Sequence, residues 1–361
     1  MERTVALVQQ PTYALDLDIR EICQRSEDLV CDLAGRHIVL TGGCGFLGRY
    51  FVAVIEWLNR TRLAEAPCRL TVIDNYISAG NFGKEIVSSA HRRVVNHDVI
   101  EPFVTDEPVD FIVHAAGIAS PAYYRKNPLQ TLQVAVWGTK NMLRLGEETG
   151  AKLVFMSSSE IYGNPDPSHI PTSEDYRGSV SCQGPRACYD ESKRLGETLC
   201  HLFFNTHGVD TRIIRPFNVY GPGMQQHDYR VLPNFADKIR RGEALNLYGT
   251  GDQTRTFCYI TDAIVGFLLV MLRGRPGDTY NIGNPRPEVS MLELIQHIER
   301  VLHRPVDHEV CVYPDSYPGD EPQRRCPDIT RARTHLGFEP LIALDEGLTR
   351  FFDWALQHYQ A

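Results

Sequence analysis

The stretch His37-Ile38-Val39-Leu40-Thr41-Gly42-Gly43-Cys44-Gly45-Phe46-Leu47-Gly48 decides the fold. Its first five residues read as a short buried strand, and a helical pattern follows the glycines as far as about Asn59. A strand, a glycine turn and a helix in this order let a pyrophosphate approach the backbone at a helix N-terminus, although a merely tight turn is the alternative. The stretch therefore predicts a dinucleotide site. Its expected contacts here are Gly42, Gly45, Phe46, Leu47 and Gly48.

The next strand specifies the dinucleotide. Residues 70–73 read as a second strand that ends at Asp74, which Asn75 follows. A carboxylate at this position accepts hydrogen bonds from the adenosine ribose and repels a 2′-phosphate. Because no arginine comes directly after Asp74, the sequence favours NAD over NADP, with Asn75 as a neighbouring contact.

Strands continue to alternate with helices along the chain. Strand-like runs occur at 93–96, 109–113, 152–156 and 210–214, and residues 128–147 read as a helix. This alternation predicts an α/β fold with a doubly wound parallel (Rossmann) sheet, in which ligands bind at the C-terminal strand ends. Further cofactor contacts are expected just after two of these strands, at Asp98, Val99, Ala115 and Ala116.

The pattern changes after Asn218, where prolines and glycines separate shorter elements. We expect an N-terminal extension at 1–35 with a helix over 18–33, and an NAD-binding domain at 36–217. Residues 218–361 should form mainly a smaller substrate-binding lobe, interleaved with the first domain because segments within about 255–283 return to it.

Composition limits the class of protein. The chain has 361 residues, 43% of them hydrophobic, and a net charge of −8. This balance argues against nucleic acid or an anionic membrane as a partner. The longest apolar run, 263–272, is too short to span a bilayer, and no secretory signal is apparent. The ten cysteines show neither CxxC pairs nor zinc-like spacing, so no metal site is expected, and the protein is predicted to be cytoplasmic.

Tyr189 and Lys193 form the candidate proton-transfer pair. On a helix from about 185 to 206 they are four residues apart and share a face. An ammonium about 4 Å from the phenol contributes roughly 4 kcal/mol at an effective dielectric of about 20. That interaction would lower the pKa of the phenol by about three units, to near 7, where a general base works best. Two surface side chains one turn apart are the alternative.

Several motifs together resemble the extended short-chain dehydrogenase/reductase superfamily over nearly all of 36–355. Within it the chain is most similar to the UDP-glucuronate decarboxylases (UDP-xylose synthases). The motifs that carry the resemblance are Gly184-Pro185-Arg186-Ala187-Cys188-Tyr189-Asp190-Glu191, Ser159-Glu160-Ile161-Tyr162-Gly163, Gln253-Thr254-Arg255 with Phe257, and Pro327-Asp328-Ile329.

The resemblance implies a reaction and roles for named residues. NAD+ takes a hydride from C4 of the sugar while Tyr189 removes the hydroxyl proton, with Lys193 on the nicotinamide ribose and Ser158 at the same oxygen. The 4-keto sugar then loses CO2, is protonated at C5 and is reduced again at C4. Glu160 and Arg325 stand at positions linked to the decarboxylation and reprotonation steps.

The resemblance also implies the partners. The substrate would be a nucleotide sugar, most simply UDP-glucuronate, and a homodimer would pack through the helix from Pro128 and the helix of Tyr189. The expected substrate contacts are Ser159, Asn218, Arg230 and Arg255.

Three alternatives stay open from the sequence. A 4,6-dehydratase of this superfamily has an Asp-Glu pair where this chain has Ser159-Glu160, and simple 4-epimerases usually lack the glutamate, so decarboxylation is favoured. A non-catalytic NAD-binding protein would usually have lost Tyr189, Lys193 or Ser158. Departures from the family pattern at Ala135, Gly223 and Cys326 lie on the substrate side and leave the sugar and nucleotide open.

Overall fold

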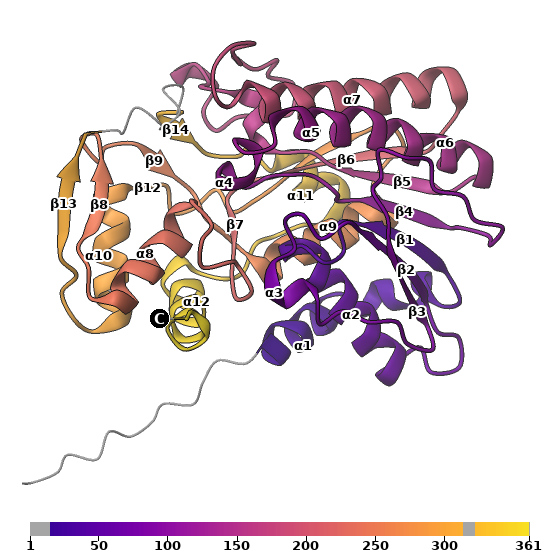
Figure 1. Ribbon diagram of the computed structural model, residues 1–361, viewed down its shortest axis with the longest axis horizontal. Helices are drawn as coiled ribbons and strands as arrows, with labels where there is room; N and C mark the ends of the chain where they lie inside the picture. The colour runs from indigo at the N-terminus through magenta and orange to yellow at the C-terminus, as the bar shows by residue number, and fades with distance from the viewer. Residues whose placement is uncertain (1–14, 313–321, 361) are drawn as a thin grey trace, which may run out of the picture.

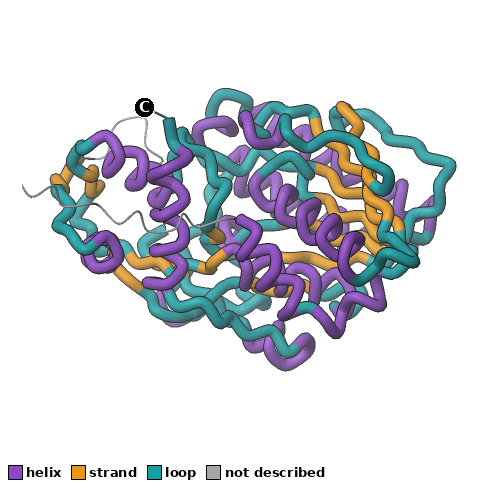
Figure 2. Tube along the Cα trace, turned by 90° about the horizontal axis from the view of Figure 1, so that it is seen from below, coloured by secondary structure: helices purple, strands orange, loops and turns teal. Residues whose placement is uncertain are grey.

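A computed structural model of the protein describes residues 15–312 and 322–360. It has a seven-stranded parallel sheet with helices on both faces and a smaller lobe beyond one end of the sheet (Figure 1). Figure 2 shows the layered body and the lobe from below. The predicted α/β doubly wound fold is confirmed.

The order of the strands places a ligand site in the sheet. The order is β11-β6-β5-β4-β1-β2-β3, and every pair in it is parallel. The chain moves outward in one direction through β2 and β3 and in the other through β4, so the direction of winding reverses between β1 and β4. In such sheets the crevice at this reversal is where ligands bind. The strands are β1 His37–Thr41, β2 Arg69–Asp74, β3 Arg92–Asn96, β4 Phe111–His114, β5 Lys152–Met156, β6 Thr211–Pro216 and β11 Thr279–Ile282.

Two groups of helices cover the sheet (Figure 1). One face carries α1 Leu15–Arg25, α2 Phe46–Thr61, α9 Ile260–Arg273 and α11 Thr330–Leu336. The other carries α4 Pro121–Tyr124, α5 Pro128–Gln133, α6 Thr139–Thr149 and α7 Ala187–His207. The single helix expected over 128–147 is α5 and α6 joined by a turn of π-helix, η2 Val134–Gly138.

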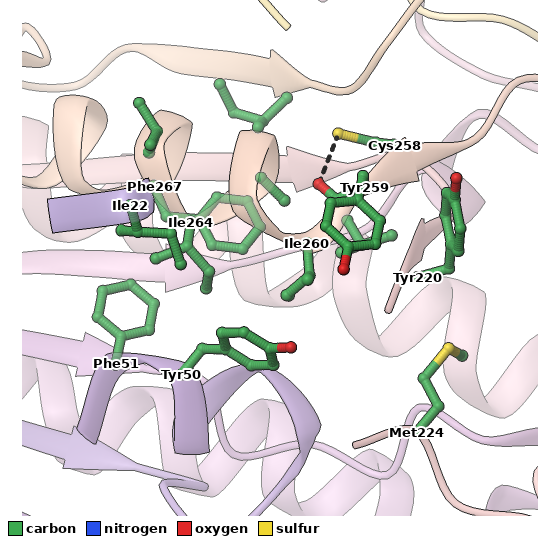
Figure 3. Packing of buried hydrophobic residues seen from close by; sticks show 14 of the residues in the cluster. Ile22, Tyr50, Phe51, Tyr220, Met224, Cys258, Tyr259, Ile260, Ile264 and Phe267 are labelled. Atoms are coloured by element: carbon green, nitrogen blue, oxygen red, sulfur yellow. Dashed lines mark hydrogen bonds between the residues drawn. The ribbon is translucent and has the colours of Figure 1, made fainter. Parts of the chain in front are cut away.

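Successive side chains of β1 point to opposite faces of the sheet, and they join a different hydrophobic cluster on each face. Ile38 and Leu40 join the larger cluster with α2 and α9, whereas Val39 joins the cluster beneath α6. In the larger cluster Phe51 of α2 stacks on Phe267 of α9, with ring centroids 6.3 Å apart, and Ile22 of α1 lies beside them (Figure 3). The N-terminal segment is therefore part of the main core.

The N-terminal segment is not the single helix expected over 18–33. Helix α1 ends at Arg25, and a 3-10 helix, η1 Glu27–Leu33, follows it. Arg25 pairs with the buried Asp262 of α9 at 2.7 Å, which fixes the end of α1 against the domain. Residues 1–14 of the expected extension lie outside the described residues.

The smaller lobe is built from short elements. Strand β8 Leu245–Tyr248 pairs with β13 His308–Cys311, and β9 Thr254–Arg255 lies between β12 Val289–Ser290 and β14 Arg324–Arg325. The capping box expected at Ser290 and Glu293 is present at the start of α10 Met291–Leu302. The elements of the whole chain that have not yet been given are α3 Gly80–Gly83, η3 Ser159–Tyr162, η4 Pro167–His169, β7 Val219–Tyr220, α8 Val231–Arg241, β10 Cys258–Tyr259 and α12 Leu344–His358. Across the two described ranges, no helix has both the length and the apolar character to cross a membrane.

Candidate active site

The first pocket lies at the C-terminal ends of β1, β2 and β4, where the winding of the sheet reverses. A Cβ added to Gly42 would lie 2.7 Å from the Ala116 nitrogen, and one added to Gly48 would lie 2.4 Å from the Gly42 oxygen. Glycine is therefore required for the turn to pack against β4 and α2. Ten predicted cofactor contacts line this pocket: Gly42, Gly45, Phe46, Leu47, Gly48, Asp74, Asn75, Val99, Ala115 and Ala116.

Asp74 connects the end of β2 to the glycine turn. Its carboxylate accepts hydrogen bonds from the backbone N–H of Cys44 at 2.9 Å and of Tyr76 at 2.8 Å. Burial raises the pKa of Asp74, and these N–H donors act against that rise. Asp98, expected as a direct contact, does not line the pocket but accepts a hydrogen bond from the Asn75 amide at 3.0 Å. A close backbone turn beside a held carboxylate fits the pyrophosphate and ribose of a dinucleotide.

A second pocket adjoins the first and shares Arg230 and Ala119 with it. It lies between the sheet and the smaller lobe, with contributions from η3, α7, α8, β9 and β14. Six of the residues predicted for catalysis or substrate binding line it: Glu160, Tyr189, Asn218, Arg230, Arg255 and Arg325. The other three, Ser158, Ser159 and Lys193, are buried and do not line it.

Tyr189 and Lys193 share a face of α7 as predicted, but the ammonium does not point at the phenol oxygen. Lys193 Nζ donates to the Met156 carbonyl at 2.7 Å and lies 5.8 Å from the centre of the Tyr189 ring. Tyr189 stacks on Tyr124, with ring centroids 5.5 Å apart.

The predicted pKa of the phenol, near 7, is wrong for this structure. Burial raises the pKa of Tyr189 to about 12, although the Ser158 hydroxyl lowers it in part. Burial also lowers the pKa of Lys193 to about 8. The cost of removing the phenolate from water is the larger effect on the pKa of Tyr189, and the spacing of two residues on a helix does not reveal that cost.

The two serines lie at the end of β5. Ser158 caps the 3-10 helix η3, where its hydroxyl accepts the backbone N–H of Glu160 at 3.2 Å. Ser159 is the first residue of η3 and is buried. The cap fixes the direction in which Glu160 leaves the strand end.

Glu160 lies between two arginines. Its Oε2 accepts a hydrogen bond from Arg325 Nη2 at 2.7 Å and another from Arg186. Burial alone would raise the pKa of Glu160, but Arg186, Arg325 and Arg255 together lower it below its ordinary value. Glu160 is therefore ionised, and its hydrogen-bond partners Arg186 and Arg325 both line the second pocket.

Asn218 and Arg255 are fixed by backbone groups of the lobe. Asn218 adopts φ +41° and donates to the Thr256 carbonyl at 2.8 Å, while its amide oxygen lies 3.4 Å from Arg325 Nη1. Arg255 donates to the Thr254 carbonyl at 2.8 Å. Arg230 donates to Asp228 through Nε at 2.9 Å and stands where the two pockets meet.

Arg186 was missed as a site residue, although it belongs to the quoted Gly-Pro-Arg-Ala motif. It lies three positions before Tyr189 at the start of α7, which brings it to the same pocket. Its spacing from the candidate base was the signal that could have found it. Tyr124, Arg125 and Tyr248 also line this pocket, and no sequence motif pointed to any of them.

Comparison with known families identifies the chain. The model of the NAD dependent epimerase/dehydratase family matches residues 38–283. The chain belongs to this family. The resemblance to extended short-chain dehydrogenases/reductases is thereby confirmed.

Curated relatives are similar along most of the chain. UDP-glucuronic acid decarboxylase 1 of Danio rerio is 38% identical over 327 residues, which cover 90% of this chain and 74% of that protein. UDP-glucuronic acid decarboxylase 5 of Arabidopsis thaliana is 38% identical over 313 residues, covering 86% of this chain and 87% of that one.

Solved structures share the fold. An epimerase of Methanothermobacter thermautotrophicus superposes with a TM-score of 0.78 and 24% identity, covering 93% of this chain and 96% of that one. A UDP-glucuronic acid 4-epimerase mutant of Bacillus cereus, solved with NAD and a fluorinated UDP-glucuronic acid, gives a TM-score of 0.76 and 23% identity, covering 90% of this chain and all of that one (100%).

Proposed function

We propose that the protein converts UDP-glucuronate to UDP-xylose and CO2 with NAD as a recycled cofactor. The observation that carries the proposal is the convergence of Tyr189, Glu160 and Arg325 on one pocket that adjoins the glycine turn. The relatives named UDP-glucuronic acid decarboxylases, similar over most of the chain, support the choice of substrate.

The residues of the first pocket would hold the cofactor. The glycine turn over 42–48 would receive the pyrophosphate at the N-terminus of α2, and Asp74 would receive the adenosine ribose. When bound, NAD supplies a two-electron acceptor and donor for hydride. Lys193, at the end of the pocket near Gly117, would hold the nicotinamide ribose.

Tyr189 would exchange the proton of the C4 hydroxyl. With a pKa of about 12 the phenol is protonated at neutral pH, which is the form needed to return a proton to C4 in the final reduction. Tyr189 would therefore release its own proton to solvent before the first oxidation, take the proton of the C4 hydroxyl in that step and give one proton back to the C4 oxygen in the final reduction. The Ser158 hydroxyl favours the ionised phenol and would donate to the same sugar oxygen.

Glu160 and Arg325 would act on the carboxylate side of the sugar. A keto group at C4 makes the substrate a β-keto acid, so the C5–carboxyl bond can break with its electrons moving into an enolate at the C4 oxygen. The reaction takes up one proton at C5 for each CO2 released. Glu160 and Arg325 are assigned to these two steps because their ion pair lies within the substrate pocket. Asn218, Arg230, Arg255 and Ser159 are assigned to the binding of the nucleotide sugar.

Assembly, location and domain division are part of the same proposal. Leu129 of α5 and Leu195 and Leu202 of α7 are exposed, as is Trp137 between α5 and α6, and helices α5 and α7 pack side by side. This apolar surface supports a homodimer through the two helices.

All ten cysteines are free thiols, which is in keeping with a cytoplasmic protein. We retain the division into an extension at 1–35, an NAD-binding domain at 36–217 and a lobe at 218–361 as a prediction.

One incubation tests the function. The purified protein is mixed with NAD and UDP-glucuronate, and the products are followed by proton NMR with CO2 detection. UDP-xylose and CO2 in equal amounts are expected. UDP-galacturonate without CO2 would instead identify a 4-epimerase. A 4,6-dehydratase acts on neutral sugars, so a 4-keto-6-deoxy product from a UDP- or dTDP-hexose, with UDP-glucuronate unchanged, would also overturn the proposal.

A further inference from the structure

Gln225 joins two loops that flank the first pocket. It follows β7, in the segment that leads to α8, and its half-buried side chain lines the first pocket. Its Nε2 donates to the Ser78 carbonyl at 2.6 Å, and its Oε1 accepts from the Tyr123 hydroxyl at 3.1 Å. Ser78 follows β2 and Tyr123 lies in α4, after β4, and β1 stands between these two strands in the sheet. The amide therefore links the loops on either side of the glycine turn.

A close approach at Gly80 gives this amide its place. A Cβ added to Gly80 would lie 2.8 Å from Gln225 Cδ, so the glycine lets the side chain lie directly against the loop after β2. The backbone N–H of Asp228 donates to the Gln225 carbonyl at 3.1 Å, which holds the segment in a turn. Both ends of the amide are used, one as a donor and one as an acceptor. A carboxylate of the same shape could not donate to the Ser78 carbonyl.

The same segment borders the second pocket. Met224, the residue before Gln225, lines the second pocket, and Arg230 lines both pockets. The Met224 carbonyl accepts a hydrogen bond from the Tyr359 hydroxyl at 3.1 Å, which ties the segment to the end of the chain. A ligand that packs against Met224 restrains the residue that follows it. Occupation of the two pockets should therefore be coupled, and the coupling acts in both directions.

The proposed reaction is completed only if the reduced cofactor stays bound. C4 gives up a hydride to NAD+ and its hydroxyl gives up a proton, the carboxylate leaves as CO2, and C5 takes up a proton. At this stage the products are a 4-keto pentose nucleotide, CO2 and NADH. Return of the hydride to C4, with one proton to the C4 oxygen, regenerates NAD+ and gives UDP-xylose. If NADH leaves first, the keto sugar has no reductant and becomes the product.

We propose that Gln225 is a clasp that keeps the reduced cofactor bound between the two hydride transfers, and that a nucleotide sugar in the second pocket tightens it. Gln225 is a positioning residue, because it acts through Ser78 and Tyr123 and not on the reacting atoms. Retention of the cofactor depends on the first pocket alone. The effect on the product rests on the proposed function.

Dissociation of NADH tests the clasp without turnover. Purified protein loaded with NADH is mixed with excess ADP-ribose, and the loss of the bound-NADH fluorescence gives the dissociation rate with and without UDP-xylose. Loss of two neutral hydrogen bonds predicts that Gln225→Ala raises this rate about 5- to 100-fold, and Tyr123→Phe, which removes one of them, should raise it less. UDP-xylose should slow release from the wild-type protein and have little effect on the Gln225→Ala variant.

Gln226→Ala is the matched control. Gln226 is the next residue, its amide donates to Asp237 and to the Gln360 carbonyl, both at 2.7 Å, and it lines neither pocket. Release of NADH from this variant should stay within about twofold of the wild-type rate. Equal acceleration in the two variants, or none in Gln225→Ala, would overturn the proposal. If Gln225→Ala does not fold, Gln225→Glu takes its place, because it keeps the shape and loses the donor to Ser78.

The products separate this proposal from the proposed function. With UDP-glucuronate, Gln225→Ala should end a larger share of turnovers in a 4-keto pentose nucleotide, seen by NMR, with NADH in the protein-free filtrate. An unchanged share, with CO2 released and NADH lost no faster than from the wild-type protein, means that the clasp alone fails. If NADH release is accelerated as expected but the wild-type protein yields no CO2, the decarboxylase assignment fails and retention of the cofactor by Gln225 stands.

Discussion

Lys193 Nζ donates a hydrogen bond of 2.7 Å to the carbonyl oxygen of Met156, the last residue of β5. The ammonium is thereby held under the Tyr189 ring, away from its hydroxyl, and burial lowers the pKa of Lys193 to about 8. The spacing of Tyr189 and Lys193 predicts a base and the cation that activates it. In the folded chain the phenol of Tyr189 is instead a weak acid, and the lysine beneath its ring has a pKa of about 8.

The pH dependence of stability should report the buried lysine. The folded protein holds the Lys193 proton less tightly than the unfolded chain, whose lysines have a pKa of about 10.4. The contribution of Lys193 to stability is therefore complete at a pH above the pKa of the unfolded chain. It is lost as the pH falls through the folded pKa of about 8. Between pH 8 and 9.5 the wild-type protein should gain about 1.5 kcal/mol relative to Lys193→Met. Urea unfolding of both proteins at the two pH values measures the difference, and parallel changes would contradict the shifted pKa.

Removing the phenol hydroxyl should slow turnover strongly without loss of binding. Tyr189→Phe keeps the ring that stacks on Tyr124 and removes the group proposed to exchange the C4 proton. We expect the decarboxylation rate to fall by about 10²- to 10⁴-fold, the usual contribution of a general acid or base. Stopped assays with UDP-glucuronate give the rate, and fluorescence titration with NADH gives cofactor binding. Tyr176→Phe, a tyrosine outside both pockets, is the control. A fully active Tyr189→Phe protein would remove Tyr189 from the mechanism.

The fold was predictable because its signals are local. The strand at 37–41, the glycine turn and the capping box at Ser290 each depend on neighbours within a few residues, and each appears where the sequence places it. The break of the N-terminal helix after Arg25 was not predictable in this way. It coincides with the pairing of Arg25 to Asp262, more than 200 residues along the chain.

The sequence predicted which residues gather at the two pockets better than it predicted their electrostatics. Spacing and motif brought Tyr189, Glu160 and Arg325 to attention, and they line one pocket. The direction of the Lys193 side chain and the ion pair of Arg186 with Glu160 depend on side-chain contacts between separate elements. Such contacts leave no periodic trace in the sequence, so the pKa of the phenol could not be derived from a four-residue spacing alone.

The glycine turn should tolerate no side chain where it meets β4. Gly42 and Gly150 both have positive φ, +69° and +72°, so alanine imposes similar backbone strain at either position. At Gly42 the new Cβ would also lie 2.7 Å from the Ala116 nitrogen, whereas at Gly150 nothing lies within 4 Å among the described residues. Gly42→Ala should therefore lose NAD binding by at least about tenfold, as measured by calorimetry. Gly150→Ala should bind NAD normally at a modest cost in stability of about 1 kcal/mol. Equal NAD affinity in the two variants would show that the close approach at Gly42 does not shape the cofactor site.

The N-terminal helix should contribute to stability through one buried carboxylate. Asp18 of α1 is fully buried, and its oxygens lie 3.0 Å from the hydroxyls of Tyr50 and Tyr259. Figure 3 labels both tyrosines, Tyr50 of α2 and Tyr259 of β10, among the side chains of this core. Asp18→Asn replaces a charged acceptor of these hydroxyls by a neutral one and weakens the pairing with Arg350, 3.5 Å away. Loss of hydrogen bonds to a buried charge should lower the free energy of unfolding by about 2–4 kcal/mol, measured by urea denaturation.

The same variant should affect the substrate more than the cofactor. The Tyr50 hydroxyl also lies 3.0 Å from the Pro222 carbonyl, in the loop that continues to Met224, which lines the second pocket. A change at Asp18 is transmitted to this loop through a single side chain, so the KM for UDP-glucuronate should rise while NAD affinity stays within about twofold. Asp16→Asn, an exposed acid on the same helix, controls for the loss of a negative charge from α1. Equal stability and equal KM in the Asp18→Asn and Asp16→Asn variants would show that the buried carboxylate neither stabilises the attachment of α1 nor affects the loop at Pro222.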